Sequence, residues 1–186
     1  MVKSNSGPII RMAPASMGTH GAGGIECCFC RCCTCIHIVF LKTLPGVIKI
    51  LETVIGGFIQ SLLINYGLRH SATIGTAFEG ALTTSSACFF TSSVLLACYF
   101  ISEKSYRLIR ASLFEMMFNA MACFFYLSSA SFLAISTKMF LMAQYYILPG
   151  FEVYPAMTAA YMLSGVVGVL HGADAYFSYL HYKNTR

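Results

Sequence analysis

The sequence contains no tryptophan and few charged residues. Only 10% of its 186 residues are Asp, Glu, Lys or Arg, whereas 57% are hydrophobic. In soluble domains about a quarter of the residues are charged, so a water-soluble fold of this size could not bury so much apolar side-chain surface. The composition therefore indicates a membrane protein.

The sequence also lacks the motifs that mark common enzymes and cleaved secretory chains. HExxH, GxxxxGK and GxSxG patterns are absent, and no paired carboxylates suggest acid–base chemistry. The residues before the first apolar run lack the n-region and h-region of a signal peptide. We predict a non-enzymatic protein that uses no cofactor and no metal.

Four long apolar segments are present instead. Gly80 to Ser102 and Val153 to Ala173 contain no Asp, Glu, Lys or Arg, and Leu44 to Tyr66 and Ala111 to Thr137 contain only a few polar residues. About 20 helical residues cross a hydrocarbon core of about 30 Å, and none of the segments shows the alternation of a β-barrel strand. We predict an all-α membrane protein, a bundle of four transmembrane helices.

The predicted organisation has four parts. A flexible cytoplasmic tail (residues 1–26) precedes a cysteine-rich juxtamembrane neck (27–42). The transmembrane domain covers residues 43–182, with spans at about 44–66, 80–102, 111–137 and 153–176, and residues 183–186 form a C-terminal tail.

The basic residues predict the orientation of the bundle. With four crossings, both termini lie on one side together with the loop "SEKSYRLIR", and only Arg69 and Lys138 face the other side. The positive-inside rule then places both termini in the cytoplasm. The formal charge of +5 belongs mostly to this face, which suits anionic lipid better than nucleic acid.

Six of the nine cysteines are crowded into "ECCFCRCCTC", shortly before the first span. Stable disulfides are not expected on the reducing cytoplasmic side, and zinc sites usually use CxxC pairs that lie farther apart. Juxtamembrane cysteines beside apolar and basic residues are typical of S-palmitoylation, which we favour over metal binding or unmodified thiols. The candidate lipidation residues are Cys27, Cys28, Cys30, Cys32, Cys33 and Cys35.

Polar residues inside the predicted spans form a second group of candidates. Ionisable residues are costly in hydrocarbon and need partners, and these lie three or four residues apart on shared helix faces. Because all of them lie toward the cytoplasmic side, a structural polar cluster is favoured over a transport pathway. The predicted cluster comprises Lys49, Glu52, Glu115, Asn119, His171 and Asp174, with Glu115 and Asn119 within reach of Arg110 or Lys49.

Small residues in the fourth span form a candidate packing face. Ser164, Gly168 and Gly172 follow one another at four-residue steps, a spacing that lets helix backbones approach closely. We predict that this face packs within the chain, and a contact with a second copy of the chain is the alternative.

The stretch "LKTLPGVIKILETVIGGFIQSLL" resembles the opening helix of MARVEL-domain proteins, with its Pro-Gly lead-in and Lys-x-x-Glu step. The four spans, short loops and last helix ending in "HGADAYFSYLHY" are also similar to that family, over residues 36–183. The cysteine-rich lead-in and short C-terminal tail look most like a small insect member associated with myoblast fusion.

This resemblance implies a protein that organises membrane in vesicle trafficking or at sites of membrane apposition and fusion, including myoblast fusion. The implied partners are membrane lipids, with a preference for cholesterol-rich membrane, and a homo-oligomer or other membrane proteins. The implied location is the plasma membrane, vesicle membranes or both. A small channel or transporter that uses Glu115, His171 and Asp174, or a cell-junction component, is the alternative.

Overall fold

The computed structural model describes residues 42–185, which lie within one compact unit. The six candidate lipidation cysteines lie outside the described residues. The helices are α1 (Leu44–Leu62), the π-helical η3 (Leu63–Gly67), the 3₁₀ turn η4 (Leu68–His70), α2 (Ser71–Ile74), α3 (Thr76–Ile101), α4 (Glu103–Arg110), α5 (Leu113–Ser136), the π-helical η5 (Thr137–Leu141), α6 (Met142–Ile147) and α7 (Val153–Thr185).

Local sequence explains where several of these helices begin. Thr43 caps α1, because its hydroxyl accepts a hydrogen bond of 3.3 Å from the amide of Gly46, and Pro45 lies in the first turn, where its missing N–H costs nothing. Gly75 (φ +74°) separates α2 from α3, and Gly150 (φ +84°) lies in the connection before α7. Glycine adopts these positive φ values without the steric cost that other residues meet.

Four helical runs are long and apolar enough to cross a membrane, namely Leu44–Ile74, Thr76–Ile101, Leu113–Ile147 and Val153–Asn184. They confirm the predicted all-α bundle of four transmembrane helices. All four runs extend beyond the predicted spans. Additional helical turns prolong the first and third, α3 begins four residues before its predicted span, and α7 continues to Thr185.

The connection "SEKSYRLIR", expected as a loop, forms the short helix α4. The hydroxyl of Ser102 accepts a hydrogen bond of 3.2 Å from the amide of Ser105 and so caps this helix. Glu103 and Arg107 add an ion pair of 2.6 Å one helical turn apart.

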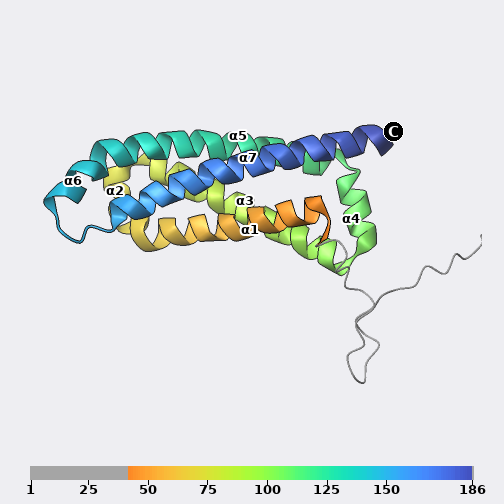
Figure 1. Ribbon diagram of the computed structural model, residues 1–186, viewed down its shortest axis with the longest axis horizontal. Coiled ribbons are helices and arrows are strands. Elements are labelled where there is room, and N and C mark those ends of the chain that lie inside the picture. Colours follow the sequence, from red (N-terminus) through yellow and green to blue (C-terminus); the bar gives the residue numbers. More distant parts are fainter. Residues whose placement is uncertain (1–41, 186) are drawn as a thin grey trace, which may run out of the picture. The chain divides into compact units, whose positions relative to one another are not determined.

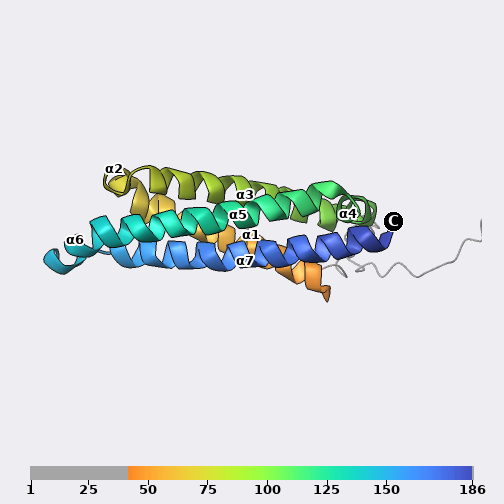
Figure 2. The same ribbon diagram turned by 90° about the horizontal axis from the view of Figure 1, so that it is seen from above.

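The long helices form a closed ring in the order α1, α3, α5, α7, and each packs against two neighbours. Figures 1 and 2 both show α5 and α7 side by side along most of their lengths. The beginning of α1, helix α4 and the end of α7 lie at one end of the bundle, which we call the α4 end. Helices α2 and α6 lie at the opposite end, which we call the α6 end.

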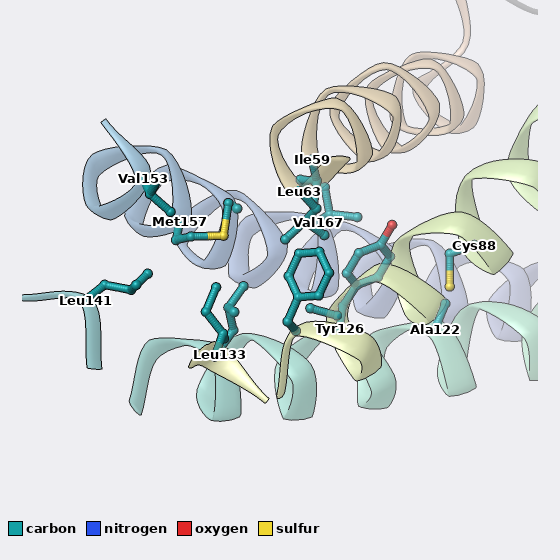
Figure 3. Close-up of a cluster of buried hydrophobic side chains, with 14 residues drawn as sticks. Ile59, Leu63, Cys88, Ala122, Tyr126, Leu133, Leu141, Val153, Met157 and Val167 are labelled. Atoms are coloured by element: carbon teal, nitrogen blue, oxygen red, sulfur yellow. The ribbon is translucent and has the colours of Figure 1, made fainter. Parts of the chain in front are cut away.

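An apolar core fills the bundle between these ends. Ile59 and Leu63 from the first run, Phe78 from α3, Leu133 from α5 and Met157 from α7 are fully buried. Figure 3 shows side chains of this core converging from all four long helical runs. Burial of such side chains is the expected source of close helix packing here.

The outer surface of the bundle is apolar as well. Each long helix exposes large hydrophobic side chains, including Val54, Phe90, Phe124 and Val169. Contiguous exposed apolar surface on this scale is incompatible with water but is the normal surface of a helix bundle in lipid.

The small-residue face of α7 lies against α5. A Cβ atom added at Gly168 would lie 3.0 Å from Leu127 Cγ, and one added at Gly172 would lie 3.1 Å from Cys123 Sγ. Ser164 is buried on the same face. The close approach of α7 to α5 therefore depends on the absence of side chains at the two glycines.

We expect Gly168→Leu to lower the free energy of unfolding by about 1–3 kcal/mol, because the new side chain overpacks against Leu127. Gly165→Leu is the matched control, since nothing lies within 4 Å of a Cβ atom at Gly165. Thermal or denaturant unfolding in detergent micelles measures both variants. If Gly168→Leu keeps its stability but changes the oligomeric mass, the face serves a second copy of the chain instead.

Candidate functional site

The predicted polar residues meet inside the α4 end of the bundle. Each of three helices contributes two buried side chains, three or four residues apart and therefore on one helix face. No member is more than 1% exposed. The members are Lys49 and Glu52 from α1, Glu115 and Asn119 from α5, and His171 and Asp174 from α7. We call this group, together with Arg110, the polar cluster.

Lys49 lies at the centre of the polar cluster. Its Nζ atom is 2.7 Å from Asp174 Oδ2 and 2.8 Å from Glu52 Oε2. It also donates a hydrogen bond of 3.1 Å to Asn119 Oδ1. The two carboxylate contacts are ion pairs, and the contact with Asn119 is a hydrogen bond. Lys49 therefore ties α1 to both α5 and α7.

Arg110 is the member that the sequence prediction did not include in the cluster. It ends α4, is 3% exposed, and its Nη1 atom donates hydrogen bonds of 2.8 Å to Asp174 Oδ1 and 3.0 Å to Glu115 Oε1. Burial lowers the pKa of Arg110, but the carboxylates of Asp174 and Glu115 outweigh burial and raise it above its usual value. Its position just before the third span, five residues ahead of Glu115, could have indicated that it belongs to the cluster.

Asn119 connects the ion pairs to His171. Its Nδ2 atom donates a hydrogen bond of 2.8 Å to Asp174 Oδ2, which fixes the orientation of the amide because a carboxylate only accepts. The amide oxygen then lies 3.0 Å from His171 Nδ1. His171 Nδ1 must therefore carry a hydrogen atom and donate it.

The charges of the polar cluster are nearly balanced. Three carboxylates, from Glu52, Glu115 and Asp174, face the two permanent cations Lys49 and Arg110. A buried net charge is costly, so one further proton brings the cluster to neutrality. Glu52 Oε1 lies 3.2 Å from His171 Nδ1, so the hydrogen on this nitrogen faces both Asn119 and Glu52.

Aromatic rings enclose the imidazole of His171. Tyr126 stacks on it with ring centroids 5.6 Å apart, and Phe118 meets it edge-on at 5.8 Å. Toward the α6 end, the apolar core follows directly. On the α3 side, the buried Leu95 and Tyr99 provide further cover. The cluster is thus enclosed by apolar and aromatic side chains.

The arrangement is suited to holding helices together. Its charged groups face one another across α1, α5 and α7, and Arg110 adds the junction between α4 and α5. Within residues 42–185, no three His, Cys, Asp or Glu side chains are placed to hold a metal ion. The small residues of α7 are not members of the polar cluster. They lie along the contact between α7 and α5.

Comparisons with known proteins cover the same helices. A family model described as MARVEL, a membrane-associating domain, matches residues 40–177, a range that includes the whole polar cluster. The chain is 41% identical over 175 residues to Protein singles bar of Drosophila melanogaster, and the match covers 92% of this chain and 99% of that protein. No solved structure matches the chain.

We expect Asp174→Asn to reduce the free energy of unfolding by about 3–5 kcal/mol, because it breaks the buried ion pairs of Asp174 with both Lys49 and Arg110. The matched control is Glu103→Gln, which breaks an ion pair of 2.6 Å whose side chains are 51% and 76% exposed. That change should cost about 1 kcal/mol or less. Similar losses for both variants in micelle unfolding would show that burial of the cluster is not what stabilises the bundle.

Proposed function

Because this chain belongs to the MARVEL family of membrane-associating domains and is a multi-pass membrane protein, we propose that it is a non-enzymatic organiser of membrane. It gathers lipids and other membrane proteins in vesicle trafficking or at sites where two membranes come together. The finer role, which includes membrane joining such as myoblast fusion, is supported by the 41% identity to Protein singles bar over 99% of that protein.

One observation carries this proposal: the ionisable groups inside the bundle are paired with one another, while the outer surface is apolar on every long helix. A protein of this construction meets other molecules through its lipid-facing surface and its two ends. Lateral contact with lipids and other membrane helices is therefore the activity that its surface suits best.

The cytoplasmic side is proposed as the anchoring side. Exposed Lys104 and Arg107 on α4 and Lys183 near the end of α7 all lie at the α4 end. Each basic residue near an anionic leaflet contributes about 1 kcal/mol of attraction. In the proposal, acyl chains on the cysteine-rich neck add to this attraction and select the plasma membrane, vesicle membranes or both.

Replacement of all six neck cysteines by Ser should abolish acyl-exchange labelling and change the distribution of the protein between membranes, because the lipid anchors are lost. The matched control replaces Cys88, Cys98 and Cys123, free thiols within the helices, and should keep the label. Acyl-exchange assays and imaging of a tagged copy provide the readouts. An unlabelled parent protein with the same distribution as the Ser variant would contradict the role given to the neck.

A channel or transporter is the competing function, since Glu115, His171 and Asp174 are ionisable residues within a membrane bundle. Their pairing and the apolar core beside them favour the organiser. Proteoliposomes that contain the protein should therefore show no more ion flux than empty liposomes. Flux that the parent protein supports and Glu115→Gln removes would establish the transporter instead.

A further inference from the structure

The connection from α5 to α7 ends in an apolar tip at the α6 end. We call residues 142–151, which comprise α6 and the loop after it, the α6 tip. Tyr146 and Ile147 are 75% and 76% exposed, and Leu148 is 51% exposed. From residue 139 to residue 151 the sequence contains no Asp, Glu, Lys or Arg. We expect an exposed and uncharged apolar surface at the extreme end of a bundle to bind an apolar partner.

We assign the limits of the hydrocarbon of the protein's own membrane from two levels of charge. The polar cluster marks one level, surrounded by exposed apolar side chains such as Phe114 and Met117. Arg69, Lys138 and Glu152 are exposed at the other level. Each lies about 20 residues along its helical run from the cluster, which corresponds to about 30 Å of helix. This distance equals the thickness of a hydrocarbon core.

The α6 tip lies beyond the second level. Ile147 follows Lys138 by about nine residues, a helical rise of up to about 14 Å. The headgroup layer on each side of the hydrocarbon is only about 5–7 Å thick. Figures 1 and 2 show α6 at the extreme end of the bundle, past the start of α7. The exposed side chains of the tip therefore reach the outer limit of the headgroups.

The base of the tip is held against the bundle by aromatic contacts. The rings of Tyr145 and Tyr154 lie 5.1 Å apart, and Phe151 meets His70 edge-on at 5.4 Å. The amide of Leu148 donates a hydrogen bond of 2.9 Å to the carbonyl of Gln144, which closes the end of α6. These contacts hold the α6 tip in a defined conformation, with its apolar side chains exposed at the end of the bundle.

We propose that the α6 tip inserts into the facing leaflet of an apposed membrane, an inference that rests on the proposed role in membrane apposition and on the predicted cytoplasmic termini. Tyrosine and aliphatic side chains together suit the boundary between headgroups and acyl chains. The absence of charge in the tip removes the cost of bringing ionised groups to that boundary. The protein then contacts two bilayers, its own along the helices and the other through the tip.

The absence of tryptophan from the chain allows a direct test. Ile147→Trp gives a protein with a single indole at the tip, reconstituted in phosphatidylcholine vesicles with the α6 end outward. When protein-free acceptor vesicles that contain brominated lipid are added, the fluorescence should lose intensity and shift to shorter wavelength. Phe124→Trp, at a side chain that is 67% exposed on the flank of α5, is the matched control. It should be quenched by brominated lipid in its own vesicle and not by the acceptors.

Three results would overturn the inference: quenching of Ile147→Trp by lipid of its own vesicle before acceptors are added, no response to acceptors, or a response only to acceptors that carry the protein. The last result would identify a second copy as the partner.

A second variant tests the same inference. Ile147→Asp combined with Leu148→Asp should weaken vesicle docking by about tenfold or more while the melting temperature stays unchanged. If the Asp variant still gathers at membrane contacts in cells, the inference about the tip is wrong but the proposed function stands. If the parent protein is absent from such contacts, the proposed function fails.

Discussion

The buried ion pairs of Lys49 with Asp174 and Glu52 are the interactions on which the rest of the bundle depends. In hydrocarbon an unpaired ammonium or carboxylate is far more costly than a lost apolar contact. The helices that carry these groups must therefore meet, and they must meet at one depth. The amide of Asn119 donates to Asp174 Oδ2, which also contacts Lys49, and the guanidinium of Arg110 donates to Asp174 Oδ1. These bonds fix α5 and the end of α4 at the same level.

This constraint divides the bundle into two ends with different properties. At the α4 end, charge, hydrogen bonds and aromatic rings specify how α1, α5 and α7 meet. Toward the α6 end, side chains such as Leu63 and Met157 pack without direction-specific polar contacts. Two π-helical segments, η3 and η5, interrupt the long helices there. Polar interactions hold the first end firmly, which leaves the second free to present the apolar tip outward.

The same division fits the proposed role as an organiser of membrane. In that role the polar cluster stabilises the bundle, and the outer surface is available for lipids and neighbouring helices. The basic α4 end suits an anionic leaflet, and the uncharged α6 tip suits a second bilayer. One small chain with few charged residues would then contact lipid through its outer surface, its α4 end and its α6 tip.

The sequence by itself determined the four transmembrane helices and six of the seven residues of the polar cluster. Apolar run length predicts membrane spans because a helix satisfies its own backbone, and spacings of three or four residues pair Lys49 with Glu52 because they reflect one helical turn. Only the tertiary structure decided which helices are neighbours, that Arg110 turns inward and that α5 covers Gly168. Lys49 and Asn119 are separated by 70 residues, and Arg110 and Asp174 by 64. Contacts over such separations follow from the packing of whole helices, which no local pattern encodes.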